Sequence, residues 1–464
     1  MLRIIPVFVL LIALLLFVEA GVGAAPPKMS TSRPLGDMVG LNVKFSQGQP
    51  MSDLPELKDL GVRWVRDGVS WADFEPLPGQ YPAAFTGDFA KRLAYYKANH
   101  IGVVFLLAYQ NSNAYPDTPA APHNSYNAEA YGRYAAAVAV RLQASGVRFV
   151  LEIWNEPHNT LAPAFGGTWN GKPPSLWVDQ YLKMADAAVT DVKAVDPKIV
   201  LLDCDDMWIV HYWFLAKGLP AALDGFAFHP YAALPERAAV DQNTDWIKPF
   251  MVVDADASFL SAVRRLREAG RQKLGHTPQM WVTEWGWETG GKSPAGPLTE
   301  DTIAAYLPRA FILADAAGVQ GMCWFSAEDS VDGPMGLESN AGVKRRQYQS
   351  FKTLTQQLGA WTLVRQIAGQ EHQTSGIQAY LFRGPGSFKV AAWSVDGPAG
   401  VSLQNTGGKP LQVVDDLGRL LPPVLSKNGR AALTLGPGPL YITGVSANVT
   451  VGPTHVTVGP AGVD

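Results

Sequence analysis

The segment "FVLEIWNEPHN" (149–159) joins a buried strand to a polar, reactive end. Its first half is almost wholly apolar, which is typical of a strand that is covered on both faces. Asn155, Glu156 and Pro157 follow at once. Glu156 could simply be a carboxylate in the first turn of a helix, where acids are favoured. If it is chemically active instead, we expect its partners at the ends of other strands.

A strand followed by a helix recurs eight times between residues 38 and 358. The mostly apolar strands are predicted at 38–45, 62–71, 101–109, 147–156, 198–205, 225–231, 279–287 and 319–329, with amphipathic segments between them. Strands of this kind need helices on the outside and packed side chains on the inside. An open doubly wound sheet uses the same units, but eight of them in a span of this length favour a closed (β/α)8 barrel, or TIM barrel.

The remaining sequence predicts the other parts of the chain. Residues 1–24 read as a signal peptide, with Arg3 before an apolar run and small residues after it, and 25–37 as a linker. The barrel is predicted over 38–361, a small C-terminal β-sandwich over 362–445 and a flexible tail over 446–464. We therefore expect a secreted or periplasmic protein, associated with a membrane only if the N-terminal segment is not cleaved.

Composition argues against several classes of function. The net charge of −3 favours neither nucleic acid nor an anionic membrane surface. No zinc-type spacing of Cys and His occurs, and neither a metal nor an organic cofactor is expected. Cys204 and Cys323 could form a disulfide or remain two buried thiols. The segment "GWETGGKS" (286–293) matches a phosphate-loop pattern, but the prolines and glycine that follow would break the helix that such a loop needs. We expect no nucleotide.

Reactive groups of a parallel barrel sit at the carboxyl ends of its strands. Besides Glu156, the predicted strand ends carry Arg66, His229 with Tyr231, and Glu284. Two carboxylates flanking one bond are the minimum for glycoside hydrolysis, where one is protonated and the other ionised. Arg66 and Tyr231 near Glu284 would keep that carboxylate charged. Glu156, partly buried near this charge, would then have a raised pKa. Arg66 could instead pair with a neighbouring aspartate.

The motifs that carry these residues resemble a known family. "WNEP" (154–157) and "TEWGW" (283–287) resemble the clan A retaining glycoside hydrolases, and more narrowly family 39 and its bacterial exopolysaccharide-hydrolase relatives. "WVRDGVSW", "FHPY" and "MGLESNAGVKRRQYQSF" fit the same pattern, and the resemblance covers about residues 38–445. Relatives often carry Asp where this chain has Gly68, and Lys-Pro where it has Arg-Arg-Gln. The resemblance therefore does not name the sugar.

The resemblance also implies roles for individual residues. Glu156 would be the acid/base, Glu284 the nucleophile and Asn155 the contact to the sugar 2-hydroxyl. Arg66 and Tyr231 would hold Glu284, His229 would line the site, and Trp324 would be the stacking platform. Trp287 and Tyr109 complete the expected carbohydrate-binding residues, while Glu152 reads as structural. His229, Tyr231 and Trp324 could each be ordinary core residues. Transglycosylation, or a carbohydrate-binding protein that kept the fold and lost turnover, are the alternatives to hydrolysis.

Overall fold

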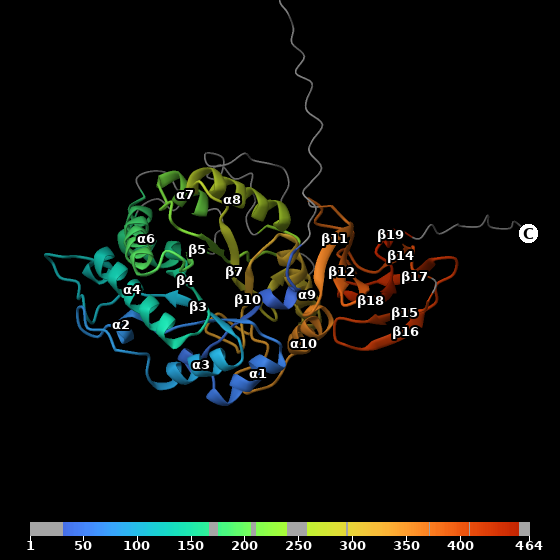
Figure 1. Cartoon of the computed structure of the whole chain (residues 1–464), viewed down its shortest axis with the longest axis horizontal. Coiled ribbons are helices and arrows are strands. Elements are labelled where there is room, and N and C mark those ends of the chain that lie inside the picture. Colours follow the sequence, from blue (N-terminus) through green and yellow to red (C-terminus); the bar gives the residue numbers. More distant parts are fainter. Residues whose placement is uncertain are drawn as a thin grey trace, which may run out of the picture.

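The computed structural model describes residues 31–166, 175–205, 210–238, 258–293, 296–370, 372–407 and 409–453. A barrel and a smaller all-β body lie side by side (Figure 1). The predicted signal peptide, 1–24, lies outside the described residues. Within the described part of the chain, no helix combines the length and apolar character needed to cross a membrane.

Eight parallel strands form the barrel. They are β1 (Val39–Asn42), β2 (Trp64–Asp67), β3 (Gly102–Leu107), β4 (Phe149–Ile153), β5 (Leu201–Asp205), β6 (Gly225–Phe228), β7 (Gln279–Trp285) and β10 (Gly321–Trp324). Each strand pairs with the next, and β1 pairs with β10 so that the sheet closes on itself. The predicted (β/α)8 fold is therefore confirmed, and the open sheet is excluded.

Helices surround the barrel. The helices predicted from sequence are α1 (Leu54–Asp59), α3 (Gly87–Ala98), α4 (Ala128–Ser145), α6 (Leu176–Val195), α7 (Val210–Lys217), α8 (Phe259–Leu274), α9 (Glu300–Ala316) and α10 (Arg346–Leu358). Short elements that the sequence analysis did not predict are α2 (Trp71–Phe74), α5 (Pro157–Phe165) and the pair β8 (Lys292–Ser293) and β9 (Gly296–Pro297). Capping sets several boundaries: the Asn127 side chain accepts a hydrogen bond from the Ala130 N–H at the start of α4.

The barrel interior changes from apolar to polar along the strands. Successive residues of a strand face opposite sides. At the amino ends, Trp64 and Trp281 meet edge to face, with ring centroids 4.8 Å apart. Cys204 and Cys323 are buried in the same inner cluster and remain free thiols, so there is no disulfide between them. The carboxyl ends of the same strands carry polar side chains instead, which places the polar end of the barrel where its chemistry is expected.

The C-terminal body contains two antiparallel sheets, as the sequence predicted. One has the order β11–β12–β13–β18–β15–β16, and the other β17–β14–β19. Their bounds are β11 (Thr362–Ala368), β12 (Ile377–Gly384), β13 (Ser387–Ser394), β14 (Ala399–Gln404), β15 (Leu411–Val414), β16 (Leu420–Val424), β17 (Arg430–Leu435), β18 (Leu440–Val445) and β19 (Thr450–Pro453).

The structure differs from two predicted boundaries. Strand β19 pairs with β14, so the sandwich continues past residue 445, where a flexible tail was expected. Its Val/Thr-rich sequence, read as a frayed end, supplies backbone groups to a sheet edge. The second half of the predicted linker is also held in place. Leu35 is buried and its N–H donates to the Trp361 carbonyl at 2.8 Å, because the barrel offers an apolar contact there.

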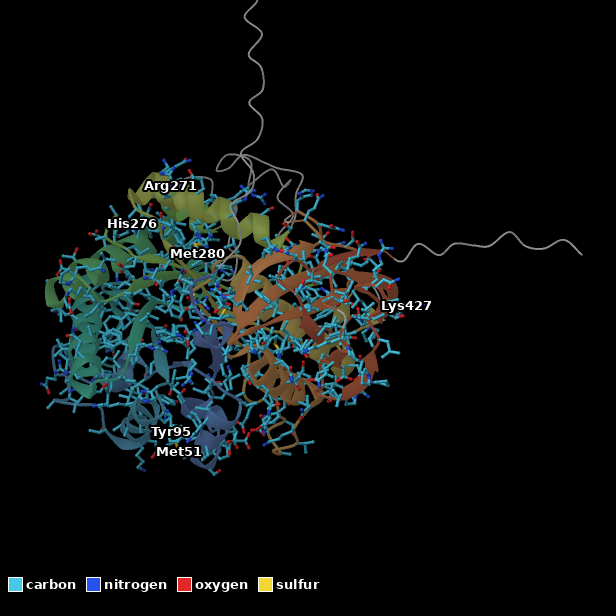
Figure 2. All side chains as sticks on the ribbon, turned by 45° about the vertical axis from the view of Figure 1, so that its right-hand side comes forward. Met51, Tyr95, Arg271, His276, Met280 and Lys427 are labelled. Carbon is cyan, nitrogen blue, oxygen red and sulfur yellow. The ribbon has the colours of Figure 1, made fainter. Side chains whose placement is uncertain are left out.

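A buried ion pair lies where the barrel meets the sandwich. Arg309 of α9 donates to both carboxylate oxygens of Glu236, with Nε to Oε1 at 2.9 Å. The Trp393 indole of β13 donates to the same carboxylate at 2.9 Å. Figure 2 shows the two bodies with all side chains drawn. Arg309 and Glu236 are almost fully buried, so removing either one would leave the other's charge buried without its partner.

Replacing Glu236→Gln is expected to destabilise the protein by about 3–5 kcal/mol, since it leaves the Arg309 charge buried without its partner. The midpoint of urea unfolding measures this. Glu268→Gln, which removes an exposed carboxylate on α8, is the control and should leave the midpoint in place. Equal midpoints for the two variants would contradict a structural role for this pair.

Candidate active site

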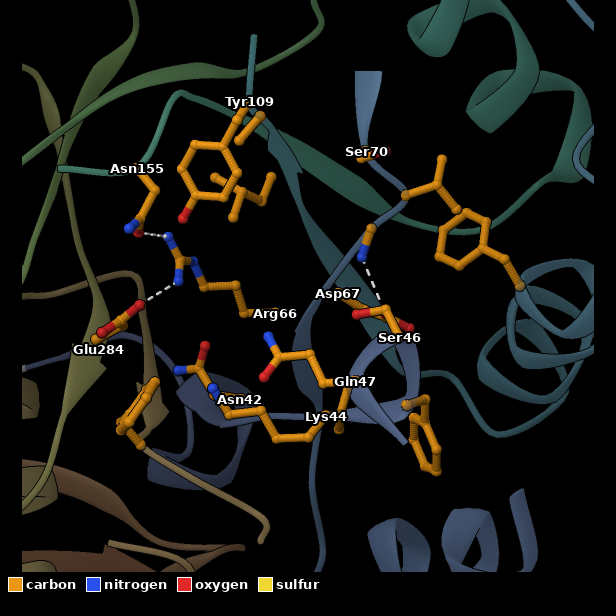
Figure 3. Close-up of a pocket in the computed structure, with 18 of the residues that line it drawn as sticks. Asn42, Lys44, Ser46, Gln47, Arg66, Asp67, Ser70, Tyr109, Asn155 and Glu284 are labelled. Atoms are coloured by element: carbon orange, nitrogen blue, oxygen red, sulfur yellow. Dashed lines mark hydrogen bonds and ion pairs between the residues drawn. The ribbon is translucent and has the colours of Figure 1, made fainter. Parts of the chain in front are cut away.

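One guanidinium connects three strands at the polar end of the barrel. Arg66, at the end of β2, donates through Nε to Glu152 Oε2 of β4 at 2.6 Å and through Nη2 to Asn155 Oδ1 at 2.6 Å. Its Nη1 donates to Glu284 Oε1 of β7. Figure 3 shows Arg66 pointing between Asn155 and Glu284. Residues far apart in sequence are therefore fixed relative to one another by a charged, directional group.

Strand alternation decides which partner Arg66 finds. Arg66 faces the interior, so its neighbour Asp67 faces the surrounding helices. There Asp67 accepts hydrogen bonds from Arg92 Nε at 2.7 Å and from the Tyr96 hydroxyl at 2.8 Å. The alternative in which Arg66 pairs with a neighbouring aspartate is thereby excluded. Burial would raise the pKa of Glu152, but the charges and hydrogen bonds of Arg66 and His229 together outweigh burial and lower that pKa to about 2. Glu152 is a permanent counter-charge.

Both oxygens of Glu284 accept hydrogen bonds. Arg66 holds Oε1, and the Tyr231 hydroxyl, which follows β6, donates to Oε2 at 2.9 Å. Burial, together with the charge of Glu284, raises the pKa of Tyr231 well above its ordinary value, so the phenol keeps its proton and remains a donor. This is the arrangement expected from the sequence.

Glu156 occupies a sharp corner between β4 and α5. Its backbone has a φ of 46°, in the left-handed region that non-glycine residues rarely adopt. Pro157 begins α5 directly afterwards. Asn-Glu-Pro therefore forms the corner that brings the Glu156 carboxylate to the barrel mouth. The side chain points to His229, whose Nδ1 lies 2.7 Å from Glu156 Oε1, while Asn159 Nδ2 donates to Oε2 at 2.8 Å.

His229 lies behind the cavity and connects Glu156 with Glu152 through hydrogen bonds. Its Nε2 lies 3.1 Å from the Thr283 hydroxyl, which donates to Glu152 Oε1 at 2.7 Å. Ionised Glu152 can only accept a hydrogen bond, so the Thr283 hydroxyl donates its one proton to Glu152. The Thr283 oxygen must therefore accept a hydrogen bond from His229 Nε2. Nε2 of His229 therefore carries a proton. The remaining hydrogen bond, between Nδ1 and Glu156, holds one further proton that the two groups share.

The ionisation of Glu156 is opposite to what the sequence suggested. Burial would raise its pKa, but the hydrogen bond and charge of His229 lower it to about 2. Burial likewise disfavours charge on His229, yet the charge of Glu284 raises the pKa of the imidazole well above its ordinary value. The shared proton thus rests on His229 in this structure. Sequence spacing gave no sign of this contact, because residues 156 and 229 lie on non-adjacent strands.

The functional groups open onto one cavity of ≈950 Å³. Asn155, Glu156, Tyr231, Glu284, Arg66 and Tyr109 line it, as expected. His229 does not, because it is completely buried beneath the two glutamates. The cavity extends from Glu284 along the loops after β1 and β2, past Lys44 to Ser70 and Asp88. One oxygen of Glu156 and one of Glu284 lie within 4.8 Å of each other.

Two expected sugar-binding tryptophans lie outside this cavity. Trp324 is completely buried, because strand alternation turns it outward with Met322, and it packs 5.8 Å from Trp287. Trp287 is also buried, and its indole donates to the Ala232 carbonyl at 2.7 Å. The next residue, Phe325, faces the cavity instead. Phe325, one residue along the chain, therefore occupies the cavity-facing position that was expected for Trp324.

Lys44 is a cavity residue that the sequence analysis missed. Its ammonium lies 4.0 Å from the centroid of the Phe325 ring. Burial lowers the pKa of Lys44, while the Glu284 charge counteracts this. The signal was present in "GLNVK": Gly40, Asn42 and Lys44 alternate with apolar residues and so share the inward face.

The phosphate-loop pattern leads to no phosphate site. Lys292 and Ser293 form β8 and pair antiparallel with β9, so they open a hairpin where such a loop would open a helix. Without a helix start, backbone N–H groups do not converge on an anion.

No family model and no curated protein matches the sequence. Solved structures do match it. A family 39 glycoside hydrolase from Bacteroides cellulosilyticus WH2 has a TM-score of 0.70 at 20% identity, over 89% of this chain and 81% of that one. This chain therefore shares the overall fold of that glycoside hydrolase.

Two further structures share this fold. A glucosidase from Croceicoccus marinus has a TM-score of 0.58 at 15% identity, over 91% of this chain and 98% of that one. A family 30 endoxylanase from Clostridium papyrosolvens C71 has a TM-score of 0.54 at 12% identity, over 92% and 98%. At the level of the fold, the resemblance predicted from the strand-end motifs is confirmed.

The raised pKa of His229 predicts how stability depends on pH. A group whose pKa is raised by folding stabilises the protein fully below its unfolded pKa, about 6.5, and loses this contribution as pH rises through the folded value. The difference in Tm between wild type and His229→Gln should therefore be largest near pH 6 and shrink as the pH is raised. Thermal unfolding at a series of pH values measures it, with exposed His372→Gln as control. A difference that grows with pH would refute the assignment.

Proposed function

We propose that this protein is a retaining glycoside hydrolase that cleaves O-glycosidic bonds of a polysaccharide or oligosaccharide. The observation that carries the proposal is the pair of glutamates in one cavity, with carboxylate oxygens of Glu156 and Glu284 within 4.8 Å of each other. Retaining enzymes place the two carboxyl groups about 5–5.5 Å apart, whereas inverting enzymes leave about 6.5–9.5 Å for a water molecule. The short separation supports double displacement.

In the first step, Glu284 attacks the anomeric carbon of the sugar. Arg66 and Tyr231 hold and orient its carboxylate through hydrogen bonds. The bond to the leaving oxygen breaks with its electron pair going to that oxygen, and Glu156 delivers a proton to it. The product is a glycosyl ester of Glu284. Asn155, held by Arg66 at 2.6 Å, lines the cavity beside both glutamates and is placed to contact the sugar.

In the second step, Glu156 removes a proton from water, which attacks the same carbon and releases Glu284. His229 supports both steps as a positioning residue. It shares one proton with Glu156 across 2.7 Å, so the pair has a proton to deliver in the first step and a place for the proton taken from water in the second. When Glu284 is esterified, its negative charge disappears, and with it the main reason for charge on His229. The pair therefore gives up its proton as Glu284 is esterified and regains one from water as Glu284 is released.

The shape and lining of the cavity support a substrate of more than one sugar. The cavity of ≈950 Å³ continues from the glutamates along the loops after β1 and β2. Phe325 offers a ring face, while Lys44, Gln47 and Asp73 offer charged and polar groups suited to hydroxyls. An oligosaccharide could therefore contact the protein on one side of the cleaved bond over several units.

Incubation with a panel of 2-deoxy-2-fluoro glycosyl fluorides is expected to trap the glycosyl ester. Intact mass of wild type should rise by one sugar, and peptide mapping should place it on Glu284. The 2-fluorine slows both steps, but the fluoride leaving group speeds the first, so the ester accumulates. Glu284→Gln should take no label. A label on another carboxylate would overturn the assignment of the nucleophile, and a non-covalent carbohydrate-binding protein would take none from any probe.

Glu156→Ala is expected to separate substrates by their leaving groups. Turnover of glycosides with alcohol leaving groups should fall by about 10²–10⁴, since they need a proton. The first step with dinitrophenyl glycosides should change little, because that leaving group departs as a stable anion. Azide should then restore turnover and give a glycosyl azide of retained configuration. Equal losses on both classes, without azide rescue, would contradict the acid/base role.

A further inference from the structure

A second group of carboxylates lies apart from the two glutamates of the cavity. Asp53 ends the short helix η3 (Met51–Asp53) just before α1. Glu328 and Glu338 follow β10 on one folded loop, where they form a parallel bridge and the Glu338 N–H donates to the Ala327 carbonyl at 3.1 Å. The group therefore joins the loop after the first strand of the barrel to the loop after the last, across the seam where the barrel closes.

Two of these residues are largely buried, and their carboxylates have no partner. Glu328 is 8% exposed and Glu338 is 6% exposed. Among the described residues, neither side chain takes part in a hydrogen bond or an ion pair. Lys344, the cation that acts on Glu338, is already occupied: its ammonium lies 2.7 Å from Glu56 and donates to the Tyr348 hydroxyl at 3.1 Å. Buried carboxylates normally have such partners, so this exception needs an explanation.

The geometry offers a place for one ion. One oxygen from each of Asp53, Glu328 and Glu338 lies within 4.8 Å of the others. Calcium binds oxygen at about 2.3–2.6 Å, so three oxygens this close can all reach a single ion. Asp53 and Glu338 line a cavity of ≈10 Å³, about one probe sphere in size, together with Gln49 and Glu56. The unpartnered carboxylate of Glu338 thus faces a space that fits a bare ion.

Either a proton or a cation can relieve this concentration of negative charge. Burial, followed by the charges of Glu56 and Asp53, raises the pKa of Glu338 to about 7. Burial and Asp53 also raise the pKa of Glu328. Protonation would neutralise one oxygen but would leave the other oxygens of the group facing one another. A divalent cation satisfies all three carboxylates at once, as hard oxygen ligands require.

We propose that Asp53, Glu328 and Glu338 bind a divalent cation, with Ca²⁺ favoured over Mg²⁺. Magnesium is bound with several of its waters retained, and the small cavity has little room for them, whereas calcium accepts carboxylates in flexible geometry. The sequence gave no warning of this site, because residues 53, 328 and 338 show no metal-binding spacing. Closure of the barrel brings them together.

The cation would act on the cavity through the loop that supplies two of its ligands. Phe325, Asp332 and Met335 of that loop line the cavity of the two glutamates. Glu328 and Glu338 flank Asp332 and Met335 in sequence, and the Leu337 N–H donates to the Ser326 carbonyl at 2.8 Å. An ion that ties Glu328 and Glu338 to Asp53 would therefore stabilise one wall of the cavity against the first turn of α1.

The test compares calcium binding and thermal stability in the full chain. Protein freed of metal with a chelator is titrated with CaCl₂ by calorimetry, and its Tm is measured in chelator, in excess Ca²⁺ and in excess Mg²⁺. We expect one calcium per chain and a rise in Tm of about 2 °C or more with Ca²⁺ at 100 times its Kd. Glu338→Gln and the double variant Glu328→Gln/Glu338→Gln should bind at least ~10-fold more weakly. Glu268→Gln, an exposed carboxylate on α8, is the control.

The same variants distinguish a cation from a proton. In chelator, Glu338→Gln should be more stable than wild type, since it removes an unpartnered buried charge, and Ca²⁺ should reverse this order by stabilising wild type alone. Wild type that shows no calcium heat and one Tm in chelator and Ca²⁺ would overturn the proposal. Undiminished calcium binding by the double variant would overturn it too, because the ion would then bind elsewhere. None of these readouts depends on glycosidase activity.

Discussion

The guanidinium of Arg66 is the interaction on which the cavity depends. It is buried at the end of β2 and held between Glu152 of β4 and Glu284 of β7. A buried cation with two carboxylates, and a third contact to Asn155, satisfies charges that would each be costly alone. The same contacts orient Glu284 and Asn155 toward the cavity. Arg66 therefore contributes both to the stability of this end of the barrel and to the orientation of the cavity residues, because its buried charge is stabilised by the same carboxylates that it positions.

A chain of hydrogen bonds carries this constraint to the second glutamate. Glu152, fixed as an anion by Arg66, accepts from Thr283, which accepts from His229. That direction leaves Nδ1 of His229 to share a proton with Glu156. The two glutamates of the cavity thus differ in kind: Glu284 is bound to a permanent cation, and Glu156 to a group that can gain or lose a proton. This difference, which the proposed double displacement would use, follows from the order of donors and acceptors behind the cavity.

The seam of the barrel combines two features that have no neighbours in sequence. The loop after β10 contributes Phe325 to the cavity and Glu328 and Glu338 to the carboxylate group beside Asp53. Closure of β1 against β10 brings this loop next to the start of α1. One segment therefore faces the cavity on one side and concentrates negative charge on the other, so that neutralising this charge would also affect the wall of the cavity.

The sequence by itself determined the fold and the strand ends that carry Glu156, Glu284, Arg66 and Tyr231, because hydrophobic periodicity and the position of a residue at a strand end are local properties. The alternation of side chains along β10 could also have predicted that Phe325, and not Trp324, faces the cavity. Only the tertiary structure decided that His229 lies beneath both glutamates and reverses the expected pKa of Glu156, and that Asp53, Glu328 and Glu338 meet at the seam. These contacts depend on distances between non-adjacent strands and loops. Barrel closure sets those distances, and the spacing of residues along the chain does not predict them.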